Sequence, residues 1–128
     1  MIHDPVTEGY ASRIDLWRSR LFIELGPDCV VCKEKYGRKR RAVHLHEGIL
    51  WRSEVMGFPP LVRLRVFADC NVFPICSSCH LSPPPREFFF NLACKKYTEQ
   101  SVRLWYGSLG WRVPPDRRFM PIEDQCSP

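Results

Sequence analysis

Apolar residues near the N-terminus recur at the spacing of an amphipathic helix. Ile14, Trp17 and Leu21 are three or four residues apart, and arginines occupy positions between them. Gly26-Pro27 follows, with a glycine that can cap a helix and a proline that cannot continue one. The pattern predicts a packing helix over residues 10–25.

A second helical pattern lies towards the C-terminus and ends before a proline-rich tail. It predicts a helix over residues 86–107, whereas residues 113–128 combine prolines with charges and are expected to form an extended arm. The apolar positions of this predicted helix are Phe89, Leu92, Tyr97, Val102, Trp105 and Tyr106.

The region between these helices predicts short strands and turns. Residues 42–47 have the pattern of a strand, Gly48 permits a sharp turn, and residues 49–51 can return as a second strand. Within residues 52–69, Phe58-Pro59-Pro60 is irregular, and Leu61, Leu64 and Val66 fit a short helix or a strand, between which the pattern does not choose. The prolines at 83–85 interrupt any helix that begins at the preceding cysteine pair.

Length and composition favour a globular protein with an anionic partner. The 128 residues suit one domain spanning residues 1–128, and 45% of them are hydrophobic. No apolar run approaches the roughly 18 residues of a membrane span. The N-terminus lacks a signal-peptide pattern, so we expect the protein to stay in a reducing cytoplasm. The net charge of +5 favours a polyanion such as nucleic acid.

Two cysteine pairs give the strongest chemical signal. Cys29 and Cys32 form one Cys-x-x-Cys pair, and Cys76 and Cys79 form the other. Each spacing lets two thiolates face one ion across a tight turn, and two pairs complete the tetrahedron that zinc prefers. We therefore predict a structural zinc site that ties distant segments together. The cysteines outside this scheme are expected to be ordinary buried or free thiols, namely Cys70, Cys94 and Cys126.

A basic segment follows the first cysteine pair. Residues 33–41 carry six lysines and arginines, with a turn expected at Tyr36-Gly37. Such a segment is either a solvated turn or a surface that neutralises phosphates and makes binding depend on salt. We predict DNA contacts from Lys39, Arg40 and Arg41, and a bidentate phosphate contact from Arg52.

Polar residues between the cysteine pairs complete a recognisable pattern. His44, His46 and Glu47 end the predicted strand, Asn71 precedes the second pair, and His80 follows it directly. The runs His46–Ile49 and Asn71–His80 resemble the HNH nuclease family, also called ββα-metal or His-Me finger nucleases. The second run matches the family signature Asn-apolar-apolar-x-apolar-Cys-x-x-Cys-His at every position.

The resemblance implies a fold and an activity. The expected fold class is α+β, with a ββα-metal core and a four-cysteine zinc site over residues 29–80 and flanking helices. The expected activity is hydrolysis of DNA phosphodiester bonds by a divalent ion, Mg²⁺ or Mn²⁺, with low sequence specificity. The helix at 86–107, Trp111 and the prolines are similar to the tails of small bacteriophage HNH proteins. Such a protein would act in the host cytoplasm, with phage packaging or recombination proteins as possible partners.

The resemblance also suggests roles for individual residues. An imidazole is a suitable base near neutral pH, so we favour His46 as the general base, with Glu47 or His44, together with His80, around the catalytic metal. The alternative places His46 on the metal and Glu47 at the base position. Asn71 would either hydrogen-bond a backbone group to orient the base or bind the metal.

Two departures from the family pattern keep a second function open. The adjacent pair at the first motif is His46-Glu47 rather than His-His or Asp-His, and residues 81–85 replace a histidine that often follows the second pair. The alternative is therefore a catalytically inactive, zinc-stabilised module that binds DNA or protein.

Overall fold

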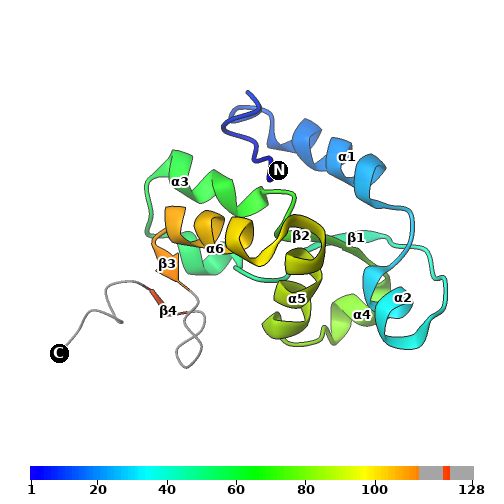
Figure 1. The fold of residues 1–128 in the computed structure, drawn as a ribbon. Coiled ribbons are helices and arrows are strands. Elements are labelled where there is room, and N and C mark those ends of the chain that lie inside the picture. The colour runs from blue at the N-terminus through cyan, green and yellow to red at the C-terminus, as the bar shows by residue number, and fades with distance from the viewer. Residues whose placement is uncertain (113–119, 122–128) are drawn as a thin grey trace.

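The computed structural model describes residues 1–112 and 120–121 and has an α+β architecture of helices around a small sheet (Figure 1). The α+β class is confirmed, whereas its assignment to the HNH family stays a prediction. No helix in these residues has the length and apolar character needed to cross a membrane. The elements are α1 (Ile14–Leu25), α2 (Val30–Tyr36), β1 (His44–Glu47), η1 (Arg52–Val55), α3 (Pro60–Leu64), η2 (Arg65–Phe67), β2 (Val72–Ile75), α4 (Ser77–Leu81), α5 (Arg86–Tyr97), α6 (Glu99–Ser108), β3 (Trp111–Arg112) and β4 (Met120–Pro121).

The sheet at the centre pairs β1 with β2 in antiparallel orientation. His46 lies opposite Phe73 and Glu47 lies opposite Val72. Every residue of β2 is buried, and α4 follows it almost directly. The predicted return strand at residues 49–51 is wrong. The backbone of that segment bonds to a side chain instead, and the partner of β1 comes from more than twenty residues further along the chain.

The N-terminal helix is shorter than predicted. It begins at Ile14 rather than at residue 10, because the preceding residues form turns and Arg13 has the non-helical φ of −136°. Trp17 and Leu21 are buried as the pattern predicts. The helix ends at Leu25, where the Gly26 N–H donates to the Phe22 carbonyl.

The predicted C-terminal helix is two helices. Thr98 adopts a φ of +79°, which ends α5, and its Oγ1 accepts a hydrogen bond from the Ser101 N–H at 3.3 Å and so caps α6. A continuous helix over residues 86–107 is therefore wrong. Of the predicted tail, only Met120–Pro121 lies within the described residues, where it pairs with Trp111–Arg112. The apolar positions predicted for this region include four buried residues: Phe89, Val102, Trp105 and Tyr106.

Gly48 is needed for space rather than for a special backbone angle. A Cβ at this position would overlap the side chain of Phe89. The ring of Phe89 also packs 4.8 Å from that of Phe73, measured between centroids. The glycine therefore lets α5 approach the end of β1 closely.

The carbonyls of η2 anchor three other parts of the molecule. The Trp105 indole N–H donates to the Arg65 carbonyl at 3.0 Å, and the Trp17 indole N–H donates to the Phe67 carbonyl at 2.7 Å. Between them, the Asn71 amide donates to the Val66 carbonyl at 2.8 Å. Three consecutive carbonyls thus fix α6, the start of β2 and α1 to one short segment.

Asn71 is fully buried, and its side chain bonds only to the backbone. Its Oδ1 accepts from the N–H groups of Ile49 and Leu50, both at 2.9 Å. Its Nδ2 donates to the carbonyls of Leu50 and Val66, both at 2.8 Å. The side chain thus ties the segment after β1 to the segment before β2.

Replacing Asn71 with alanine should strongly destabilise the protein. The change leaves buried backbone groups at residues 49, 50 and 66 without partners, and each such group costs roughly 1–3 kcal/mol. Equilibrium urea unfolding should show a decrease in stability of about 3 kcal/mol or more. Asn91→Ala, on an exposed position of α5, is the matched control and should change stability little. Equal unfolding midpoints for the two variants would contradict this role.

Candidate metal centre and adjacent histidine groove

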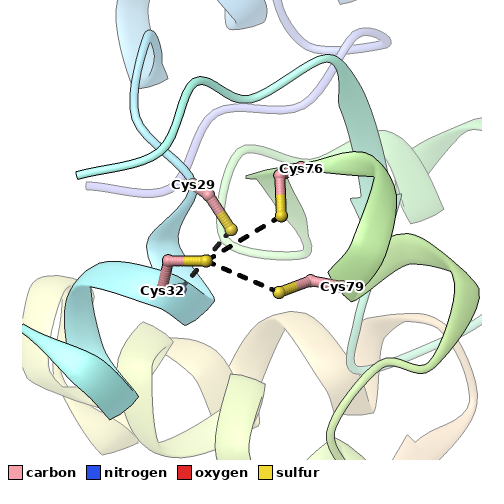
Figure 2. A group of neighbouring side chains, drawn as sticks. All are labelled: Cys29, Cys32, Cys76 and Cys79. Carbon is pink, nitrogen blue, oxygen red and sulfur yellow. Dashed lines mark hydrogen bonds between the residues drawn. The ribbon is translucent and has the colours of Figure 1, made fainter. Parts of the chain in front are cut away.

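The two cysteine pairs meet between α2 and α4. Cys29 is the N-cap of α2 and Cys32 lies in its first turn, while Cys76 precedes α4 and Cys79 lies within it. Figure 2 shows the four sulfur atoms turned towards a common centre. Cys32 Sγ lies 3.8 Å from Cys76 Sγ and 3.8 Å from Cys79 Sγ, and all four sulfurs lie within 4.8 Å of one another.

These separations suit a tetrahedral metal ion. Zinc–sulfur bonds of about 2.3 Å place the sulfurs of a regular tetrahedron about 3.8 Å apart. Three of the cysteines are buried and Cys79 is half-buried. The four thiols can therefore hold a metal such as zinc, as the spacing predicts.

The local environment of the cluster favours release of one proton. Burial opposes ionisation, but hydrogen bonds from the Cys79 backbone and from the other thiols lower the pKa of Cys76 to about 6. Burial and the hydrogen bond with Cys76 raise the pKa of Cys79. Without a cation the four sulfurs cannot all become thiolates, so metal binding must displace protons.

The remaining cysteines do not extend the cluster. Cys70 is fully buried, and burial raises the pKa of its thiol well above the ordinary range. Cys94 is half-buried, which agrees with the expected ordinary thiols, and Cys126 lies outside the described residues. Within residues 1–112 and 120–121, the four-cysteine cluster is the one group of three or more metal-binding side chains close enough to share an ion.

Three histidines gather beside the four-cysteine cluster. The His44 and His80 rings stack with centroids 4.3 Å apart, and the His46 ring meets that of His80 edge-on at 6.0 Å. His46 also packs against Phe89 at 5.1 Å. Burial, and then the nearby His80, lower the pKa of His46 below its ordinary value of 6.5. Its imidazole is therefore neutral near pH 7 and can accept a proton.

Glu47 takes part in a different cluster. Its carboxylate is 7% exposed and lies 2.6 Å from Arg52 Nε and 3.5 Å from Arg18 NH1. Alternation along β1 explains this, because neighbouring residues of a strand point to opposite faces. Glu47 thus pairs with two arginines, while the His44 and His46 imidazoles both contact that of His80.

An open groove, called the histidine groove below, joins the histidine cluster to the Glu47 cluster. It has a volume of about 610 Å³ and is lined by residues of α1, β1 and α4, together with Val43 and Arg52. His44, His80 and Arg18 all contribute to its walls. The sequence pattern placed Arg18 among the polar residues of a packing helix and did not predict its place in this groove. The available signal was its position next to buried Trp17.

The basic segment is exposed, and its backbone bonds to the first cysteine of the four-cysteine cluster. Its side chains at residues 33, 35 and 38–41 are exposed, and Gly37 ends α2 with a φ of +62°. The Cys29 N–H donates to the Arg40 carbonyl at 2.7 Å. Lys35, Arg38 and Arg40 line a second groove of about 430 Å³ that also includes Cys79. The predicted DNA-contacting side chains are therefore accessible.

Comparisons with protein-family profiles, with curated proteins and with solved structures find no significant match to this chain. Any assignment of function therefore rests on the residues themselves.

Removing one thiol from the cluster should remove both metal and stability. We expect one zinc per chain to survive dialysis, and Cys29→Ser or Cys76→Ser to release it and largely unfold the protein, because metal binding contributes folding free energy. Elemental analysis and circular dichroism measure the two effects. Cys94→Ser, outside the cluster, is the control and should keep both metal and fold. Folded wild-type protein without zinc would contradict the prediction.

Proposed function

We propose that this chain is a metal-dependent endonuclease that hydrolyses DNA phosphodiester bonds. The observation that carries the proposal is the histidine cluster, in which imidazoles from β1 and α4 lie beside a groove with two arginines in its wall. Imidazoles supply a base and metal ligands, and arginines bind phosphate. The resemblance of these same residues to the HNH signature supports the choice of reaction.

The proposed division of roles follows from the environment of each histidine. His46 is the general base, because it is partly buried against Phe89 and neutral near pH 7. His44 and His80 are the imidazoles that would hold the catalytic ion, since both line the groove. This donor set suits Mn²⁺ better than Mg²⁺, which prefers oxygen ligands. When bound, the ion would polarise the scissile phosphate.

The alternative assignment, with Glu47 as the base, has less support. Glu47 is committed to Arg52 and Arg18, and a carboxylate beside two guanidinium groups is a poor proton acceptor. Its position also argues against direct metal binding, because those positive charges would oppose a divalent cation. The low sequence specificity proposed for the enzyme agrees with phosphate contacts as its main interaction with DNA.

One observation favours a second function, a zinc-stabilised binding module without catalysis. In the described part of the chain, the histidines and carboxylates form no second group of three that could share an ion. A module of this kind would use the same exposed basic segment to bind DNA. Metal-dependent nicking by the purified protein separates the two functions.

Replacing His46 with alanine should remove cleavage while preserving the fold. General-base removal typically lowers the rate by about 100- to 10,000-fold, whereas zinc content and DNA affinity should stay near wild type. Supercoiled-plasmid nicking with Mg²⁺ or Mn²⁺ measures the rate. His3→Ala is the matched control, because His3 pairs with Glu8 outside the groove.

Either of two results would count against the nuclease. Wild-type nicking rates in folded His46→Ala protein would reject this active site. A wild-type chain that binds DNA and retains zinc, yet nicks with neither ion, would favour the binding module.

The basic segment should set the salt dependence of DNA binding. Replacing Lys39, Arg40 and Arg41 with alanine should weaken binding and lower the log–log salt slope by about 0.9 for each phosphate that the protein no longer neutralises. Fluorescence anisotropy with a labelled duplex over a salt series measures the slope. A charge-matched control replaces Arg63, Lys96 and Arg103, which lie on α3, α5 and α6. Equal slopes in the two triple variants would show that the segment is only a solvated turn.

A further inference from the structure

We infer that Glu47 is a positioning residue, which holds Arg18 and Arg52 together as a phosphate-binding pair at the histidine groove. The inference deepens the proposed function and rests on it, since the phosphate would belong to the bound DNA strand. It also gives Arg18 a role in binding and gives Glu47 a role other than base or metal ligand.

The fold brings the two arginines to one aromatic platform. Trp17 donates its indole N–H to the Phe67 carbonyl, which fixes α1 and therefore the neighbouring Arg18. The guanidinium carbon of Arg18 lies 5.5 Å from the centroid of the Phe67 ring, and that of Arg52 also lies 5.5 Å from it. Cation–π attraction holds each group near the ring.

Glu47 offsets the repulsion between these two cations. Its buried carboxylate lies within 4 Å of both guanidinium groups, at 2.6 Å from Arg52 and 3.5 Å from Arg18. One negative charge against two positive charges leaves a net charge of +1. The cluster therefore remains attractive to an anion while its members stay close together.

Arg52 is the more exposed of the two arginines and keeps most of its hydrogen-bonding capacity. A guanidinium has five N–H donors. Arg18 NH2 makes one long bond to the Leu45 carbonyl at 3.5 Å, whereas Arg18 NH1 is buried beside Glu47 and is not available to a bound anion. Arg52 makes no hydrogen bond to the described residues, since its short contact with Glu47 is poorly angled and is an ion pair only. Phosphate oxygens are suitable acceptors for these donors.

The position of the pair fits a strand lying in the groove. Arg18 and Arg52 line the same space of about 610 Å³ as His44 and His80. A phosphate bound by the arginines would lie in the groove that holds these imidazoles. Leu45 of β1, whose carbonyl accepts from Arg18, lines the same groove.

The test measures binding of a short labelled DNA duplex without added Mg²⁺ or Mn²⁺, with zinc content verified. Arg18→Gln and Arg52→Gln should each weaken binding and lower the log–log salt slope by about 0.9. Arg13→Gln is the matched control, because it removes one positive charge from the start of the same helix outside the groove. It should leave the slope near wild type.

The direction in which Glu47→Gln changes DNA affinity decides between a positioning role and a simple charge effect. The change makes the protein more positive, so charge alone predicts tighter DNA binding. A positioning role predicts weaker binding, with a lower salt slope, in protein that remains folded by thermal denaturation. If Glu47→Gln does not fold, Arg18→Gln and Arg52→Gln still test the pair against Arg13→Gln.

The outcomes separate this inference from the proposed activity. Tighter binding by folded Glu47→Gln, or an Arg18→Gln slope equal to that of Arg13→Gln, overturns the positioning role even if the wild type nicks plasmid. If Arg18→Gln, Arg52→Gln and Glu47→Gln all bind DNA more weakly and the wild-type protein never nicks plasmid, the phosphate-binding pair is supported and the nuclease is contradicted.

Discussion

The carboxamide of Asn71 is the interaction on which the arrangement of the site depends. Its four hydrogen bonds join the backbone after β1 to the backbone before β2. Both segments are buried there, so their polar groups need partners that the sheet does not provide. Arg52 follows the first segment, and Phe67, whose ring lies near both arginines, belongs to the η2 turn that Asn71 binds. The Asn71 side chain therefore also positions the arginines of the histidine groove.

The four-cysteine cluster constrains the opposite end of β2. Asn71 directly precedes this strand and Cys76 directly follows it, so each end is attached to a long-range contact. The pairing with β1 is thereby held in a single register. A shift of one residue in this register would turn the histidine side chains to the face that Glu47 now occupies, and would turn Glu47 to the face that the histidines now occupy. The register of four residue pairs thus decides which face of the sheet carries the histidines and which carries Glu47.

Local signals predicted much of this structure, and long-range contacts account for most of the remainder. The Cys-x-x-Cys spacing fixes each thiol pair within one turn, and buried Trp17 and Leu21 follow from helical periodicity. By contrast, Ile49 and Leu50 have the pattern of a strand but bond to a side chain 21 or 22 residues away. The sequence gives only a weak signal for the break between α5 and α6 at Thr98, namely that threonine commonly caps helices.

The pairing of Glu47 with Arg18 had no local signal, because it joins α1 to β1 across 29 positions. Because this contact is long-range, the residue type of Glu47 alone left open whether it is a base or a metal ligand. A carboxylate beside histidines suggests a metal ligand, but strand alternation directs it away from them. Its ion pairs instead bring two cations to the groove that His44 and His80 line. A single four-residue strand thus carries two imidazoles and, through the ion pairs of its buried carboxylate, holds two guanidinium groups close together.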